Sequence, residues 1–136
     1  MSQAEEVLRG IYGAINSGDL GQLEKYVADD YIEHSDGFQG VEPFQQQIAA
    51  FRAGFPDLQV TVDELLVDGD RFASRTTVTG THTGDLMGMP ATGQRISVEA
   101  VDIGRIENGL AKERWGGLNM YSMLTQLGVI PAPQAG

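Results

Sequence analysis

A chain of 136 residues, 41% hydrophobic and 21% charged, has the size and composition of one globular domain. Nineteen acidic residues against nine basic ones give a net charge of −10, which would repel a polyanion and argues against a nucleic-acid partner. No run approaches the ~18 apolar residues that span a bilayer, and the acidic start MSQAEEVLRG does not resemble a secretory signal. We therefore expect a cytoplasmic protein without a membrane partner.

The cysteine and histidine content limits the chemistry of the chain. Cysteine is absent, which excludes disulfides, thiolate metal ligands and cysteine nucleophiles. Only two histidines are present, so one chain cannot build a histidine-rich metal site. We expect no metal site.

The first part of the chain predicts two helices. Ser2 followed by Glu5 fits a capping box, and apolar residues then recur on one helical face as far as residues 16–18. That face consists of Val7, Leu8, Ile11, Tyr12 and Ile15. Asp19 can cap a second, shorter helix that ends near residues 29–30. Its inward stripe is Leu20, Leu23, Tyr26 and Val27.

A short extended piece and a third helix come next. Residues 31–34 read as extended chain before the loop 35–37. Pro43 suits the first turn of a helix, whose apolar residues recur every three to four positions up to Phe55.

From Leu58 the apolar period changes to two, which predicts strands. Asp68-Gly69 marks a tight turn, and Asn108-Gly109 predicts a type I′ hairpin. The strands expected around these turns begin at Leu58 and cover residues 72–82, 96–106 and 110–115, with a glycine-rich loop at 84–93.

A final helix begins near Met120, with Gly128 as its stop signal, and residues 131–136 read as a flexible tail. Helices followed by antiparallel strands predict an α+β fold in which a curved sheet packs against the N-terminal helices. We expect a single domain over residues 1–130, with a cavity for a small ligand between helices and sheet.

Four ordered stretches carry a resemblance that covers nearly the whole chain: EEVLRGIYGAINSGDLGQLEKYVADDYIEHS, GTHTGDLMGMPATGQRI, RIENGLAKERW and MLTQLGVIP. The chain resembles the SnoaL-like polyketide cyclases of the nuclear-transport-factor-2-like superfamily. The resemblance implies a cone-shaped α+β barrel that forms a homodimer or higher homo-oligomer. It also implies a cofactor-free intramolecular aldol condensation that closes the last ring of an aromatic polyketide.

Such chemistry needs a base for an acidic C–H proton and donors for the enolate and new alkoxide, inside an apolar pocket. In the cyclases the principal acid/base is an aspartate at the end of the strand before the last helix, and that position falls on Gly116 here. Glycine cannot exchange a proton. Gly116 and Gly117 are explained either by backbone that needs φ > 0 or by enlargement of the pocket.

Three residues are candidates for acid/base catalysis. His34 lies where the related ketosteroid isomerases carry a proton-shuttling aspartate, although it could merely bond a loop backbone. His82 ends a long strand at a position that often lines the cavity in this family, or lies at a solvated rim. Asp102 lies mid-strand where the cyclases have a pocket histidine, and burial would raise its pKa, but alternation alone does not fix its face.

Five further residues are candidates for substrate binding. Arg75 could anchor a ligand carboxylate, pair with Asp102 as in the limonene epoxide hydrolases, or pair at the surface. Trp115 could form cavity wall or core, and Asn119 could reach the cavity or cap the last helix. The two methionines of the glycine-rich loop suit either a flexible lid or burial against the helices: Met87 and Met89.

Two main hypotheses for function remain. The first is a cofactor-independent enzyme, of the cyclase, isomerase or hydratase type, that acts by acid/base chemistry on an apolar oxygenated small molecule. The second is a non-catalytic binding or accessory domain for a hydrophobic metabolite, which Gly116 favours. A structural dimerisation module that uses the sheet face is a third.

Overall fold

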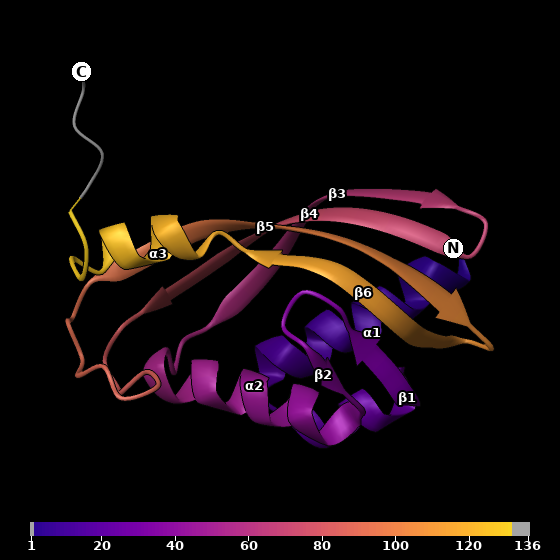
Figure 1. Cartoon of the computed structure of the whole chain (residues 1–136), viewed down its shortest axis with the longest axis horizontal. Coiled ribbons are helices and arrows are strands. Elements are labelled where there is room, and N and C mark those ends of the chain that lie inside the picture. Colours follow the sequence, from indigo (N-terminus) through magenta and orange to yellow (C-terminus); the bar gives the residue numbers. More distant parts are fainter. Residues whose placement is uncertain (1, 132–136) are drawn as a thin grey trace.

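A computed structural model describes residues 2–131 and shows a curved six-stranded sheet with two long helices against one face (Figure 1). The helical elements are α1 (Gln3–Ser17), the 3-10 helix η1 (Leu20–Lys25), α2 (Val41–Gly54) and α3 (Met120–Gln126). The strands are β1 (Val27–Glu33), β2 (Phe38–Gln39), β3 (Gln59–Asp68), β4 (Arg71–Thr81), β5 (Arg95–Glu107) and β6 (Leu110–Leu118). The predicted α+β class is confirmed. Of the predicted tail, residues 132–136 lie outside the described part of the chain.

The sheet has the order β2-β1-β6-β5-β4-β3 and is open at both edges. Strands β3 to β6 pair antiparallel with their neighbours, as predicted. Strand β1 is the exception in the predicted antiparallel sheet, because it lies parallel to β6, with Ile32 opposite Glu113 and Glu33 opposite Arg114. This parallel pair brings the exit of β1 beside the last strand, where the cavity lies.

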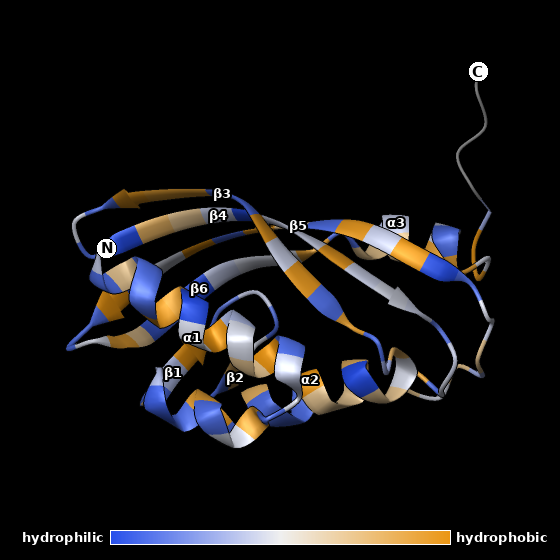
Figure 2. Cartoon of the chain, turned by 180° about the vertical axis from the view of Figure 1, so that it is seen from behind, coloured by the Kyte–Doolittle hydropathy of each residue, from blue (hydrophilic) through white to orange (hydrophobic). Residues whose placement is uncertain are grey.

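Helix α1 follows the predicted pattern closely. The Ser2 hydroxyl accepts a hydrogen bond from the Glu5 amide at 3.2 Å, and Gly18 ends the helix with a φ of 79°. The predicted apolar face is turned to the sheet, while the other side of α1 carries hydrophilic residues (Figure 2). Burial of this face ties α1 to the concave side of the sheet.

The second predicted helix is corrected in length and type. It is a short 3-10 helix that ends at Lys25, and the chain has already entered β1 at Val27. Val27 pairs with Ala111 of β6, and the Ala111 amide donates to the Tyr26 carbonyl at 2.8 Å. Tertiary pairing with β6 therefore overrides the helical pattern of the residues before Tyr31.

Strand β5 settles which residues face the helices. Its even-numbered positions are buried and its odd-numbered ones are exposed or half-buried. The buried set is Ile96, Val98, Ala100, Asp102, Gly104 and Ile106. Asp102 therefore lies on the core face, in line with apolar side chains.

The end of the chain confirms two turn predictions and corrects one strand end. Asn108 and Gly109 both have positive φ, at 53° and 76°, as a type I′ turn requires, and Gly128 ends α3 with a φ of 78°. Strand β6 continues to Leu118 and does not stop at Trp115.

Candidate active site

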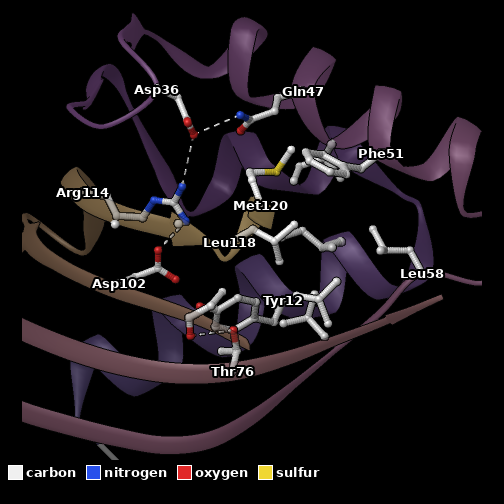
Figure 3. A pocket seen from close by; sticks show the side chains of 17 residues that line it. Tyr12, Asp36, Gln47, Phe51, Leu58, Thr76, Asp102, Arg114, Leu118 and Met120 are labelled. Atoms are coloured by element: carbon white, nitrogen blue, oxygen red, sulfur yellow. Dashed lines mark hydrogen bonds and ion pairs between the residues drawn. The ribbon is translucent and has the colours of Figure 1, made fainter. Parts of the chain in front are cut away.

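A cavity of about 200 Å³ opens between the concave face of the sheet and helices α1 and α2 (Figure 3). Its apolar lining comes from α1, α2, the central strands and the start of α3: Ile15, Ile48, Phe51, Leu58, Val60, Val78, Ala100, Leu118 and Met120. Its polar lining is Tyr12, Asp36, Gln47, Thr76, Asp102 and Arg114, together with the backbone of Gly116 and Gly117. A small, mostly apolar chamber with a few converging polar groups is typical of a small-molecule site.

Asp102 is the buried carboxylate of this chamber. Its side chain is 3% exposed, and Oδ1 lies 3.0 Å from Nη1 of Arg114. Among the described residues no donor is aligned for a hydrogen bond to Oδ1, so the contact is an ion pair rather than a directed bond. Burial raises the pKa of Asp102 above its usual range, Arg114 opposes that rise, and the charges of Glu33 and Asp36 add to it.

Arg114 is held in place from behind the chamber by Glu33. The guanidinium donates through Nε to Oε1 of Glu33, whose side chain is fully buried. Glu33 in turn accepts hydrogen bonds from the Tyr31 hydroxyl at 3.0 Å and from the Ser35 amide at 3.2 Å. Burial lowers the pKa of Arg114, but the neighbouring Asp102, Tyr31 and Glu33 outweigh it and raise that pKa, so the guanidinium stays charged.

Tyr12 projects from α1 into the same chamber. Its hydroxyl lies 3.5 Å from Oγ of Ser74. Burial, followed by the negative charge of Asp102, raises the pKa of the Tyr12 phenol, which therefore stays protonated. A neutral hydroxyl at this place can donate to an oxygen that gains negative charge.

Gly116 is directly opposite Asp102 in the β5–β6 ladder. A Cβ built at position 116 would lie 2.1 Å from the Val101 carbonyl oxygen and 2.8 Å from the Asp102 Cα, and φ there is 123°. At Gly117 a Cβ would meet nothing within 4 Å, although φ is 144°. The absence of a side chain at 116 thus lets β6 approach β5 beside Asp102.

The two histidines lie away from Asp102 and do not line the chamber. His34 is on the outer face, where Nε2 lies 2.8 Å from Oε1 of Glu113 and the ring stacks on Trp115 at a centroid distance of 4.1 Å. His82 is fully buried, and its Nδ1 accepts a hydrogen bond from the Thr92 amide at 3.2 Å. His82 therefore fastens the glycine-rich loop to the end of β4.

The substrate-binding candidates also lie elsewhere. Arg75 is on the outer face of β4, at 3.6–3.8 Å from Asp63, Glu64 and Glu99, so the surface pairing and not the pairing with Asp102 is present. Trp115 is 38% exposed on the outer face.

Asn119 caps α3, where its Oδ1 accepts from the Ser122 amide at 3.0 Å. Met87 is 63% exposed, Met89 packs against the core, and neither lines the chamber.

Of the eight predicted site residues, only Asp102 lines the chamber. Arg114 and Tyr12 were missed as site residues. Tyr12 was predicted on the inward face of α1, and the polar hydroxyl on that face could have marked it as a site residue. The prediction that Trp115 forms part of the cavity wall implied that Arg114 faces outward. Neighbouring residues of a strand face opposite sides of the sheet.

The curved sheet, the covering helices and the buried acid–base pair define the class: an α+β fold of the nuclear-transport-factor-2-like type with an internal chamber. The sequence profile of the SnoaL-like polyketide cyclases matches residues 5–127, and the chain belongs to this family.

Two curated relatives and two solved structures illustrate the match. The chain is 25% identical over 135 residues to aklanonic acid methyl ester cyclase DauD of Streptomyces sp. (strain C5), covering 94% of this chain and 83% of the relative. It is 27% identical over 121 residues to nogalonic acid methyl ester cyclase of Streptomyces nogalater, covering 85% and 90%.

Among solved structures, TsrD from Streptomyces laurentii superposes with a TM-score of 0.87 at 29% identity, covering 94% of this chain and 96% of that one. IdmH, a putative polyketide cyclase from Streptomyces antibioticus, superposes with a TM-score of 0.81 at 30% identity, covering 93% and 99%. Within residues 2–131, no helix is long and apolar enough to cross a bilayer.

Proposed function

We propose that the protein closes a ring of a polyketide by intramolecular aldol condensation, with Asp102 as the acid/base. The observation that carries the proposal is a buried carboxylate, 3.0 Å from a guanidinium, inside an apolar chamber of a polyketide cyclase family. Burial raises the pKa of Asp102, which makes its ionised form a stronger base than a solvated aspartate.

The steps balance without a further reactant. Ionised Asp102 takes the proton of an acidic C–H group and leaves an enolate, whose carbon attacks a carbonyl carbon of the same molecule. The resulting alkoxide takes the proton back from Asp102. In this scheme the Arg114 guanidinium and the Tyr12 hydroxyl, which line the chamber, stabilise the oxygen that carries negative charge.

The test is conversion of aklanonic acid methyl ester, with nogalonic acid methyl ester as second substrate and no added cofactor. We expect a product of unchanged mass and altered retention in chromatography coupled to mass spectrometry. Heat-denatured protein is the control for spontaneous cyclisation. Binding of either ester without conversion above that control would show a binding protein instead.

The pH dependence follows from the buried carboxylate. Asp102 must be ionised to act as a base. We therefore expect kcat/KM to rise as the pH passes the pKa that Asp102 has in the substrate-free protein. Because burial raises that pKa, we expect the midpoint of the rise above the ordinary aspartate value of about 3.9. The measurement is kcat/KM from pH 4 to pH 9, with circular dichroism at each pH to exclude unfolding. A profile that is flat down to pH 4 would contradict this role.

We also propose that the outer sheet face pairs two copies of the chain. The strand register aligns Leu66, Ile103 and Trp115 in one row across β3 to β6, and these side chains are 62%, 50% and 38% exposed. We expect Ile103→Glu to reduce the dimer mass in light scattering to that of one chain. Ser97→Glu, on the same face of β5, should leave the mass unchanged, and a monomeric wild type would refute the proposal.

A further inference from the structure

The charges around the chamber are unbalanced. Arg114 is the only cationic side chain in the chamber's lining, as far as residues 2–131 show. Three carboxylates lie within 3.8 Å of its guanidinium, those of Glu33, Asp36 and Asp102. The guanidinium is thus already shared among several acids before any substrate enters.

This imbalance bears on which ligands the chamber accepts. A ligand with a free carboxylate would bring a further negative charge to a guanidinium that is already surrounded by acids. Like charges a few Å apart repel each other, and the repulsion is stronger at a partly enclosed site than in bulk water. A ligand whose carboxyl group is esterified carries no such charge.

Asp36 is the carboxylate of this group that is best placed to act on an entering ligand. It lies in the turn between β1 and β2, which is closed by a 2.9 Å hydrogen bond from the Gly37 amide to the Glu33 carbonyl. Gln47 of α2 donates to Oδ2 of Asp36 at 3.0 Å and keeps the carboxylate at the chamber wall (Figure 3). The side chain is 41% exposed, in contrast with the buried Glu33 and Asp102.

The aldol steps do not use Asp36. Its Oδ2 lies 3.8 Å from Nη2 of Arg114, on the side of the guanidinium away from the Asp102 contact with Nη1. The Gln47 amide nevertheless holds the Asp36 carboxylate at the chamber wall, so this group affects entering ligands without taking part in the reaction. It places negative charge where a ligand passes.

We propose that Asp36 is a specificity-determining residue that discriminates against ligands with a free carboxylate and so selects neutral, esterified ones. The inference rests on the proposed function, because it concerns the substrate of the same chamber. In the opposite case, the carboxylate of a ligand would displace the Asp36 carboxylate and pair with the Arg114 guanidinium itself.

The test is calorimetric binding of methyl 2-naphthoate and 2-naphthoic acid at pH 8 and low salt. In the wild type we expect the ester to bind at least tenfold more tightly. Part of that preference arises in any apolar chamber, so the variant is decisive. Asp36→Asn should bind the acid about three- to tenfold more tightly than the wild type does, with ester affinity unchanged. High salt should narrow the wild-type ratio, because Asp36 is partly exposed.

The matched control is Asp85→Asn, which removes the same charge from an exposed position outside the chamber lining. It should leave both affinities unchanged. Weaker binding of the acid by Asp36→Asn, equal effects of the two variants, or failure of the wild type to bind either probe would overturn the proposal. Binding is measured without turnover, so an absence of cyclisation would refute the proposed function and leave this result intact.

Discussion

Asp102→Asn should lower kcat/KM for ring closure by about 10²- to 10⁴-fold, the usual contribution of a positioned acid/base. The amide keeps the shape of the carboxyl group but cannot take a proton from carbon. It also leaves Arg114 bound to Glu33, so the chamber should keep its form. The measurement is steady-state turnover, with ligand affinity measured by calorimetry in parallel.

Measurements of ligand affinity and of stability show whether Asp102→Asn loses turnover through a lost catalytic group or through misfolding. We expect the affinity for the methyl esters to change less than threefold, a small energy beside the loss of turnover. Because burial raises the pKa of Asp102, its contribution to stability is fully present below the unfolded pKa and is lost as pH rises through the folded one. Relative to the wild type, Asp102→Asn should therefore be more stable at pH 8 than at pH 4. Full turnover in Asp102→Asn would remove this residue from the mechanism.

Gly116→Ala should destabilise the protein by about 4 kcal/mol, because backbone strain and overpacking each cost about 1–3 kcal/mol. The new Cβ would collide with the Val101 carbonyl oxygen, and backbone cannot move aside as a flexible side chain can. The measurement is the free energy of unfolding from urea titration.

Gly117→Ala is the matched control for the substitution at Gly116. Position 117 also has positive φ but is open around its Cβ, so it should lose only the strain, about 1–3 kcal/mol. Equal losses at the two positions would mean that the close approach of β5 and β6 is not what position 116 requires.

The regular elements could be predicted because local signals and burial agree there. The Ser2 cap, the apolar face of α1 and the Asn108-Gly109 turn each depend on a few neighbouring residues. Strand β1 could not be predicted in the same way. Its first residues carry a helical pattern, and only the pairing with β6, more than 80 residues further along the chain, makes them a strand.

The candidate site was less predictable than the fold, because facing depends on register. Asp102 was singled out as a carboxylate among apolar neighbours, and the alternation of β5 places it in the chamber. The histidines were singled out for their chemistry, yet one stacks on Trp115 outside and the other fastens a loop. Residue type suggested them, but His34 follows β1 on the outer side of the sheet, His82 follows β4, and neither lines the chamber.

The site depends on two parts of the chain that are far apart in sequence, because β1 near the N-terminus pairs in parallel with β6 near the C-terminus. The Glu33–Arg114 contact spans 81 residues of chain, so it forms only after a long loop has closed. A local opening that detaches the N-terminal third would leave β3 to β6 paired but deprive Arg114 of its support. Hydrogen exchange would then show β1 opening with a lower free energy than β4 and β5, and loss of activity would precede global melting.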